Sequence, residues 1–274
     1  MDIFETAAKK TIITAHMGVN GATIPANSIK AYKIAVEQGA DMIEIDVSKS
    51  IEGTLYIMHP GLEKTIGINM RLSQMHDDQL ENKMLYTFGG TLTDYPMPKL
   101  DEVFEEFKGK CFINVDKFLD NPAEICQCIK RHNIAEQCIV KSSPKPEVLD
   151  IVENYAPEIP YLPIISEIAD THEVMMKRNI NYIGSELVFD RPDHEFLTEN
   201  YVEKLHKAGK LAWGNAIVYS YKTVLAAGQS DNSSLAGDPE NGWGWLVDNG
   251  FDIIQTDWTL AMRLFLEKTG RLYK

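Results

Sequence analysis

Two acidic residues, Glu44 and Asp46, stand in an apolar stretch of the sequence, and His59 follows a turn signal further along the chain. Alternate residues of a strand point to the same side, so the two carboxylates would share one face and repel each other. Buried carboxylates need a counter-charge, which is either a basic side chain or a cation. The residues alone leave both interpretations open, a salt-bridge network in the core and a metal site.

A hairpin is predicted to bring His59 to this carboxylate pair. Glu52 and Gly53, between two apolar runs, are typical of a two-residue hairpin loop. In the register of that loop Asp46 faces His59, with the side chains about 5 Å apart. A shift of one residue would point His59 to the opposite side, so the prediction depends on the register.

Further polar residues stand where other predicted strands end. They are His16 after the first strand, Asp116 and Lys117 after the third, Lys141 in the fourth, Glu186 in the sixth, Trp213 in the seventh and Asp257 in the eighth. Taken singly, Asp257 is typical of a helix cap, Trp213 of a core residue and Glu186 of a structural ion pair. Without these three, three acids, two histidines and two lysines still converge on one end of the predicted sheet, which packing alone does not explain.

These residue types together favour phosphoryl chemistry. Oxygen ligands from three carboxylates suit one hard divalent cation, Mg²⁺ or Ca²⁺. Two imidazoles beside it are suited to general acid–base catalysis near pH 7. The lysines favour an anionic substrate, so the cation would neutralise charge while one histidine takes a proton and the other protonates the leaving oxygen.

The elements that must position these residues alternate regularly along the chain. Predicted strands cover 11–18, 42–48, 111–116, 138–142, 161–166, 182–189, 211–218 and 252–257, and predicted helices cover 27–39, 122–133, 145–156, 171–179, 197–209, 243–250 and 259–270. This alternation predicts an α/β fold with a parallel sheet, and eight units predict a (β/α)₈ TIM barrel. A doubly wound open sheet is the alternative, but it would carry a G-x-G-x-x-G phosphate turn, which the sequence lacks.

Two segments interrupt the alternation. The chain between the second and third strands is too long for one unit, so we expect a hairpin-containing insertion over about residues 49–98 within a single domain of residues 1–274. Residues 219–242, rich in Ser, Asn, Asp and Gly, predict a long loop after the seventh strand. Both segments follow strand C-termini, the end at which barrel enzymes keep their active sites, and a long loop there is typical of a lid or mobile segment.

Composition restricts the partners. A net charge of −13 without a basic cluster argues against nucleic acid. The apolar runs are too short for stable membrane insertion, and the N-terminal residues lack a signal-peptide layout. The four cysteines show no C-x-x-C pattern, which favours a reduced, cytoplasmic protein with structural cysteines. The partner predicted is a small phosphodiester substrate, and the oligomeric state stays open.

The remaining histidines are interpreted as structural or solvated. They are His76, His132, His172, His194 and His206, in polar helical or loop contexts without a partner at ligand spacing.

In chain order, these motifs resemble the glycerophosphodiester phosphodiesterase family, within the phosphodiesterase (β/α)₈ barrel superfamily that includes the spider-toxin-like phospholipases D. In the first half of the chain, the family's A-H-R-G corresponds to AHMG (15–18), E-N-T to ANS (26–28), E-x-D to EID (44–46) and H-D to HP (59–60). In the second half, N-x-E/D corresponds to INVD (113–116), V-K-S to VKS (140–142), W-x-N to WGN (213–215) and G-x-D-x-I-x-T-D to GFDIIQTD (250–257). Each motif alone is weak evidence for the resemblance, but together, in this order, they extend over nearly the whole chain.

The resemblance implies a role for each site residue. It implies His16 and His59 as the acid–base pair, Glu44, Asp46 and Asp116 as metal ligands, and Lys117 or Lys141 as phosphate contacts, and Glu186 and Trp213 complete the predicted substrate-binding set. It also implies that a glycerol hydroxyl of the substrate attacks phosphorus, releasing the alcohol and forming a cyclic phosphate. Water opens that ring in the hydrolases, whereas the toxin-like relatives stop at the cyclic product.

The sequence departs from the family pattern around the site. Met17 replaces an arginine, Ala26 a glutamate and Pro60 an aspartate, and the lysine expected at position 118 is shifted to Lys117. An arginine contact to phosphate is charge-assisted, and methionine cannot supply it. Because the two histidines and three acids are all present, we expect activity on a substrate different from the family norm.

Three rival interpretations remain. A catalytically silent barrel would bind metal or phosphodiester without turnover. A lyase-type phospholipase acting on lysolipids would form a cyclic phosphate and need an apolar groove, for which the insertion offers Met70, Met75, Met84, Leu85, Tyr86 and Phe88. These side chains would otherwise simply cover the barrel. A glycosidase fits less well, because neither histidines nor lysines would then have a role.

Overall fold

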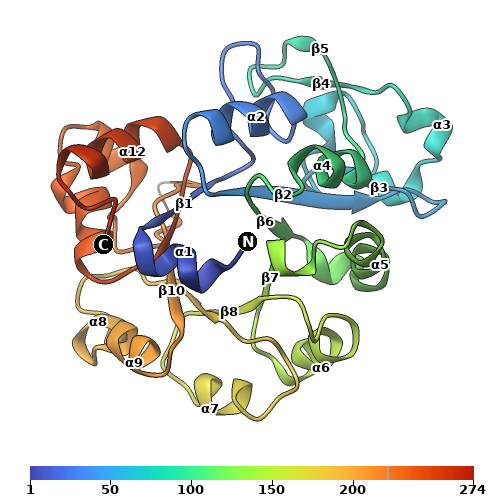
Figure 1. The fold of residues 1–274 in the computed structure, drawn as a ribbon. Coiled ribbons are helices and arrows are strands. Elements are labelled where there is room, and N and C mark those ends of the chain that lie inside the picture. The colour runs from blue at the N-terminus through green and yellow to red at the C-terminus, as the bar shows by residue number, and fades with distance from the viewer. Residues whose placement is uncertain (221) are drawn as a thin grey trace.

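Eight short, buried strands form a closed ring in the computed structural model, which describes residues 1–220 and 222–274 (Figure 1). The ring consists of β1 (Ile12–Ala15), β2 (Met42–Lys49), β6 (Phe112–Asp116), β7 (Cys138–Ser142), β8 (Tyr161–Ile165), β9 (Gly184–Leu187), β10 (Leu211–Asn215) and β11 (Ile253–Thr256). All neighbours are parallel, and β1 pairs with both β2 and β11. This closure confirms the (β/α)₈ barrel, and the open-sheet alternative is wrong.

Helices follow the strands and surround the ring. They are α2 (Ile29–Glu37), α4 (Leu100–Phe107), α5 (Pro122–His132), α6 (Pro146–Tyr155), α7 (Thr171–Met175), α8 (Glu195–Thr198), α9 (Tyr201–Lys207), α11 (Trp245–Asp248) and α12 (Thr259–Lys268). Local sequence sets their ends: the Ser28 side chain caps α2 by accepting from the Ala31 backbone, and Pro122 begins α5. The predicted helix over 197–209 is divided into α8 and α9.

Successive side chains of each strand point to opposite faces of the barrel wall. On β2, Ile43 and Ile45 pack outward in the core cluster shared with the surrounding helices. Met42, Glu44 and Asp46 therefore point inward. Each strand thus turns an apolar residue toward the helices and leaves the next position for the barrel interior.

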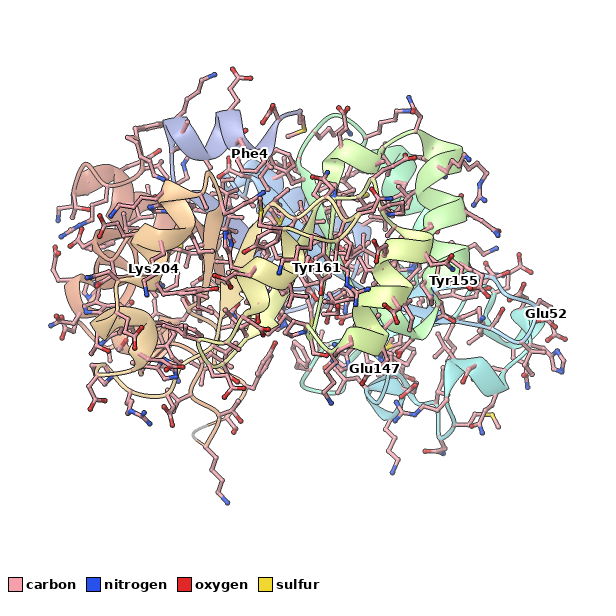
Figure 2. All side chains as sticks on the ribbon, turned by 90° about the horizontal axis from the view of Figure 1, so that it is seen from below. Phe4, Glu52, Glu147, Tyr155, Tyr161 and Lys204 are labelled. Atoms are coloured by element: carbon pink, nitrogen blue, oxygen red, sulfur yellow. The ribbon has the colours of Figure 1, made fainter. Side chains whose placement is uncertain are left out.

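The N-terminal end of the barrel is closed by a helix that the sequence analysis did not predict, α1 (Ile3–Lys9). Its Ile3 and Ala7 belong to one buried apolar cluster with inward-facing residues of the ring, including Phe112 and Trp213. The helix crosses the ring in Figure 1 and lies at the upper edge of Figure 2, where Phe4 is labelled. The open end of the barrel is therefore the C-terminal one.

The insertion after β2 contains β3 (Leu55–Ile57), α3 (Asp77–Leu80), β4 (Met84–Tyr86) and β5 (Leu92–Pro96). β3 pairs antiparallel with the end of β2, and β4 pairs with β5 in a separate two-stranded sheet. A small apolar cluster of its own, which includes Leu72, Leu80 and Leu85, holds the insertion together. Glu52, at the tip of the hairpin, lies at the outer edge of the molecule (Figure 2).

The predicted hairpin register is wrong by one residue. Val47 pairs with Ile57, and Ser50 donates its N–H to the carbonyl of Thr54 at 3.0 Å. The loop therefore has three residues, ending at Gly53 with φ +94°, a conformation that glycine adopts readily. His59 consequently lies beyond β3 rather than across the ladder from Asp46.

The segment 219–242 is only partly a loop. It contains α10 (Asp231–Leu235), and a π-helical turn over Glu240–Gly244 leads into α11. Asp231 is buried and accepts from the side chains of Thr256 and Trp243, which ties this segment to β11. Tyr221, also part of the predicted loop, is outside the described residues.

Two further observations concern the chain as a whole. Among the residues that the structure describes, no helix has the length and apolar character needed to cross a membrane. The four cysteines are all free thiols.

Candidate active site

Three carboxylates meet inside the C-terminal end of the barrel, as predicted. Glu44 and Asp46 come from β2, and Asp116 ends β6, where parallel pairing places it opposite Asp46. One oxygen of each lies within 4.8 Å of the others. Asp46 is 0% exposed and Glu44 is 3% exposed, so these are acids held away from water.

The electrostatics of this trio call for a cation. Burial, and then the charge of Asp46, raises the pKa of Glu44 to about 8. Burial, and then Asp116, also raises the pKa of Asp46. Burial would raise the pKa of Asp116 as well, but Lys117 and Lys141 outweigh it and hold that pKa below its usual value. Buried acids whose pKa values rise in this way are stabilised as carboxylates by a bound cation.

One atom of the trio supports a metal site directly. Asp46 Oδ1 is buried and has no hydrogen-bond partner among the described residues. Lys117 Nζ lies 3.8 Å away and His59 Nε2 lies 4.0 Å away, both beyond hydrogen-bond distance. The other Asp46 oxygen accepts from the Asn27 side chain at 2.9 Å. The trio therefore fits a divalent cation with oxygen ligands.

Lys117 lies at the edge of this trio. Its Nζ donates to Asp116 Oδ2 at 2.5 Å, and its side chain is 30% exposed. A left-handed backbone at Lys117, φ +60°, turns the lysine toward the acid that precedes it. Phe118, where the family pattern would place the lysine, is buried in the core. The shift in sequence thus still leaves an ammonium group at the site.

His16 follows β1 and is held by Asp257, which follows β11. The distance from His16 Nδ1 to Asp257 Oδ1 is 2.9 Å. The prediction that Asp257 caps the next helix is wrong, since α12 has no side-chain cap. Burial lowers the pKa of His16, but the Asp257 hydrogen bond and the charges of Glu44 and Asp46 outweigh this and raise it to about 9. The edge of the Tyr219 ring packs on the imidazole, with ring centroids 5.8 Å apart.

His59 reaches the site from the segment after β3. Its Nδ1 lies 2.9 Å from the backbone carbonyl of Pro60. A carbonyl oxygen can only accept, so Nδ1 carries the proton of the neutral ring and Nε2 presents a lone pair. That Nε2 faces Asp46 at 4.0 Å. The histidine is therefore present at the trio as predicted, although the register that predicted it was wrong.

Two residues of the site that were not assigned roles hold the carboxylates in place. The backbone N–H of Met17 donates to Glu44 Oε2 at 2.9 Å, and Asn27 donates to Asp46. Both have left-handed backbones, with φ of +53° and +56°. Non-glycine residues in this region cost about 1–3 kcal/mol each and collect at functional sites. The motif ANS at 26–28 contains this asparagine, so the sequence could have indicated a role for Asn27 at the site.

Lys141, Glu186 and Trp213 form one buried network inside the barrel. Lys141 Nζ donates to Glu186 Oε2 at 2.6 Å and lies 3.9 Å from the Trp213 ring centroid. Asn215 donates to the other Glu186 oxygen and accepts from the indole N–H. Trp213 is fully buried, so any effect of this residue on phosphate binding would act through the lysine.

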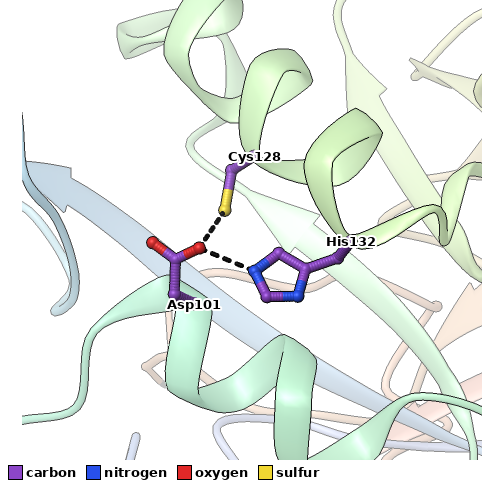
Figure 3. Close-up of side chains that lie close together, drawn as sticks. All are labelled: Asp101, Cys128 and His132. Atoms are coloured by element: carbon purple, nitrogen blue, oxygen red, sulfur yellow. Dashed lines mark hydrogen bonds and ion pairs between the residues drawn. The ribbon is translucent and has the colours of Figure 1, made fainter.

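A second cluster of side chains of the kinds that bind metals joins two helices outside the barrel. Asp101 of α4 accepts from His132 at 2.6 Å and from the Cys128 thiol at 3.5 Å, both on α5 (Figure 3). Arg131 also donates to the same oxygen, at 2.5 Å, and so places a guanidinium beside it. We interpret this group as an ion-pair network between helices. The expectation that His132 has no such partner is wrong, because α4 supplies one from elsewhere in the sequence.

Parts of the chain are similar in sequence to known proteins. A family described as a domain of unknown function matches residues 161–266. A glycerophosphodiester phosphodiesterase of Caldanaerobacter subterraneus is 28% identical over 142 residues, which cover 48% of this chain and 58% of that protein. The match therefore spans little more than half the length of that relative.

Solved structures cover almost the whole chain. A glycerophosphoryl diester phosphodiesterase from Parabacteroides distasonis has a TM-score of 0.77 at 15% identity, covering 98% of this chain and 93% of that one. A phosphodiesterase from Oleispira antarctica, in complex with the product sn-glycerol-3-phosphate, has a TM-score of 0.69 at 16% identity, covering 97% and 100%. The predicted resemblance to glycerophosphodiester phosphodiesterases is thereby confirmed at the level of the fold.

Proposed function

We propose that the protein is a metal-dependent phosphodiesterase, which cleaves a glycerophosphodiester-like substrate to an alcohol and glycerol phosphate. The observation that carries this proposal is the trio Glu44, Asp46 and Asp116 near two imidazoles, with one buried oxygen of Asp46 that no described residue hydrogen-bonds. The shared barrel and the phosphodiesterase relatives support it. A cytoplasmic location remains a prediction.

The trio would hold one divalent cation, Mg²⁺ or Ca²⁺. When bound, the cation would neutralise charge on the phosphoryl oxygens and on the carboxylates. Lys117 adds a positive charge at the edge of the site, where its side chain is partly exposed. The buried pair of Lys141 and Glu186 keeps a second ammonium group deeper in the barrel. These groups would orient an anionic substrate at the open end of the barrel.

The two histidines would divide the proton transfers. The carbonyl of Pro60 keeps a proton on His59 Nδ1, so Nε2 is the ring nitrogen that would take a proton from the attacking hydroxyl. His16, whose pKa is raised to about 9, is protonated at pH 7 and is suited to give a proton to the leaving oxygen. Asp257 fixes the orientation of His16 through Nδ1, which leaves Nε2 for the substrate. The substrate's own glycerol hydroxyl is the expected nucleophile, and water would then open the cyclic phosphate.

Phosphorus NMR of purified protein with simple glycerophosphodiesters and Mg²⁺ or Ca²⁺ tests the proposal. We expect glycerol phosphate as product, loss of turnover with EDTA and recovery on adding the cation. His16→Ala and His59→Ala should each lower kcat by about 10²–10⁴-fold. His76→Ala is the matched control, because this histidine is exposed and pairs with Glu52 on the hairpin.

The same assay tests the role of the metal and distinguishes two of the rivals, the lyase and the silent barrel. Full activity after chelation would refute the role of the metal. A cyclic phosphate as the final product would identify a lyase. Cation binding without turnover of any phosphodiester would identify a silent barrel.

A further inference from the structure

A small cavity opens beside His59, and its walls are mainly apolar. Its volume is about 30 Å³. Met17 and Ala26 line it from the segment after β1, and Leu85 and Phe88 line it from the insertion. One water needs about 10–15 Å³ of such space, so the cavity has room for about two or three carbon atoms.

The cavity adjoins the proposed catalytic groups. His59 is one of its walls, and so is Asn27, which donates to Asp46. Met17, a third wall, donates its backbone N–H to Glu44. A substrate whose phosphate lies at the carboxylate trio could therefore place a neighbouring group in this cavity.

Two polar groups at this wall already have partners, whereas His59 Nε2 stays available to the reacting part of the substrate. Asn27 donates to Asp46, and its Oδ1 accepts from the Tyr32 hydroxyl at 2.6 Å. His59 Nδ1 is bonded to the Pro60 carbonyl. A hydroxyl or ammonium group entering here would lose hydration without gaining these partners, whereas carbon atoms would not.

Phe88 extends the apolar wall outward. It is 66% exposed, although it belongs to the lining of the cavity. Met17 and Ala26 are uncharged, so this part of the wall offers no ionic partner to a substrate. An aliphatic chain would fill the cavity with its first carbons and cover the Phe88 ring with the rest.

We propose that this cavity is a subsite for an aliphatic chain, so that the substrate is a glycerophosphodiester with an alkyl or acyl chain on its leaving alcohol or on its glycerol. This inference rests on the proposed function, because it places the scissile phosphate at the carboxylate trio. The insertion then selects the substrate, since it contributes Leu85 and Phe88 to the subsite.

Three substrates test the subsite and locate the chain. Glycerophosphoethanolamine has no chain, glycerophosphobutanol has one on the leaving alcohol, and 1-butyryl-glycerophosphoethanolamine has one on the glycerol. Each buried methylene contributes about fourfold in binding. We expect kcat/KM for one of the two chain-bearing substrates to be at least tenfold higher than kcat/KM for glycerophosphoethanolamine. Equal or lower values for both would overturn the proposal.

A pair of variants links the preference to the cavity. We compare kcat/KM for the preferred chain-bearing substrate with kcat/KM for glycerophosphoethanolamine. Phe88→Ser should lower this ratio by about threefold or more. Leu92→Ser is the matched control, because Leu92 is similarly exposed, at 58%, but lies outside the cavity lining. An unchanged ratio in Phe88→Ser, or an equal loss in both variants, would contradict the assignment.

A binding measurement separates the subsite from catalysis. Dimethyl phosphate and dibutyl phosphate, each with Mg²⁺, are compared by the shift in Tm that they cause. If no substrate is turned over but dibutyl phosphate gives the larger shift, which Phe88→Ser abolishes, the subsite stands and the proposed function fails. If the two shifts are equal, the subsite is refuted whatever the turnover.

Discussion

At the scale of single residues, the two histidines are fixed by different kinds of partner. His16 is held by a carboxylate and His59 by a backbone carbonyl. A carboxylate partner favours the protonated imidazole, whereas a carbonyl partner fixes the tautomer of the neutral ring. The replacement of the family's aspartate by Pro60 therefore does not leave His59 without an orienting group.

The Asp257→Asn variant tests the role of His16. The raised pKa of His16 means that its proton is lost as the pH rises through about 9, so an acid catalyst would lose activity on that alkaline limb. Removing the carboxylate should move the alkaline limb of kcat/KM to lower pH, by about one pH unit. The measurement is a pH–rate profile of both proteins.

Metal affinity is the control for this variant, because Asp257 is not one of the three clustered carboxylates. Mg²⁺ binding should therefore be nearly unchanged. An alkaline limb at the same pH in both proteins would remove His16 from the role of acid.

The sequence predicted which residues lie at the site better than it predicted their partners. Glu44, Asp46 and Asp116 follow from strand alternation and strand ends. Asp257 was assigned to a cap because its neighbours in sequence suggest one. Its actual partner, His16, comes from the opposite end of the chain, and only the closure of β1 on β11 brings the two together.

At the scale of elements, the hairpin shows the same limit. The residues around Gly53 signal a turn, but they do not decide between loops of two and three residues. The three-residue loop shifts every pair by one position. His59 still reaches Asp46, because Met58, just after β3, donates its backbone N–H to the Asp46 carbonyl at 2.9 Å and so keeps the chain beside that residue.

The network between α4 and α5 gives a prediction about stability. Burial would raise the pKa of Asp101, but hydrogen bonds from Arg131, His132 and Cys128 outweigh it and hold that pKa below its usual value. A lowered pKa in the folded state stabilises the protein above the unfolded pKa, and this stability is lost as the pH falls through the folded value. Asp101→Asn should therefore lower the free energy of unfolding by about 1 kcal/mol at pH 7.

Urea unfolding at several pH values measures this effect. The difference from the wild type should shrink as the pH falls below about 4. Glu105→Gln, an exposed substitution on the same helix, is the control. An equal difference at pH 7 and pH 3 would argue against the ion-pair network.

At the scale of the whole molecule, the barrel has one open end and one closed end. The regular alternation of strands and helices was enough to predict all eight ring strands. The closing helix α1 was not predicted, because an isolated short helix has little signal of its own and is stabilised by packing. Its Ile3 and Ala7 contact the ring from outside the repeating pattern.

The Ile3→Ala variant tests the contribution of this closure. Ile3 is 5% exposed, so its truncation should lower the free energy of unfolding by about 2–3 kcal/mol. Phe4→Ala, on the same helix but 39% exposed, should cost less than about 1 kcal/mol. Urea unfolding measures both losses, and kcat/KM should stay within about twofold because the carboxylates lie at the other end. A large loss of activity with unchanged stability would contradict this view.

The closed N-terminal end of the barrel also determines where substrate and product can enter and leave. Inward-facing apolar side chains fill the interior of the barrel beneath the carboxylates, and α1 covers them, so the proposed substrate would enter and leave at the C-terminal end. If the protein has the proposed activity, substrate and product would use the same opening, and bound glycerol phosphate would block the next substrate. Such an enzyme is expected to show competitive product inhibition, and its throughput in a cell would follow how quickly that product is removed.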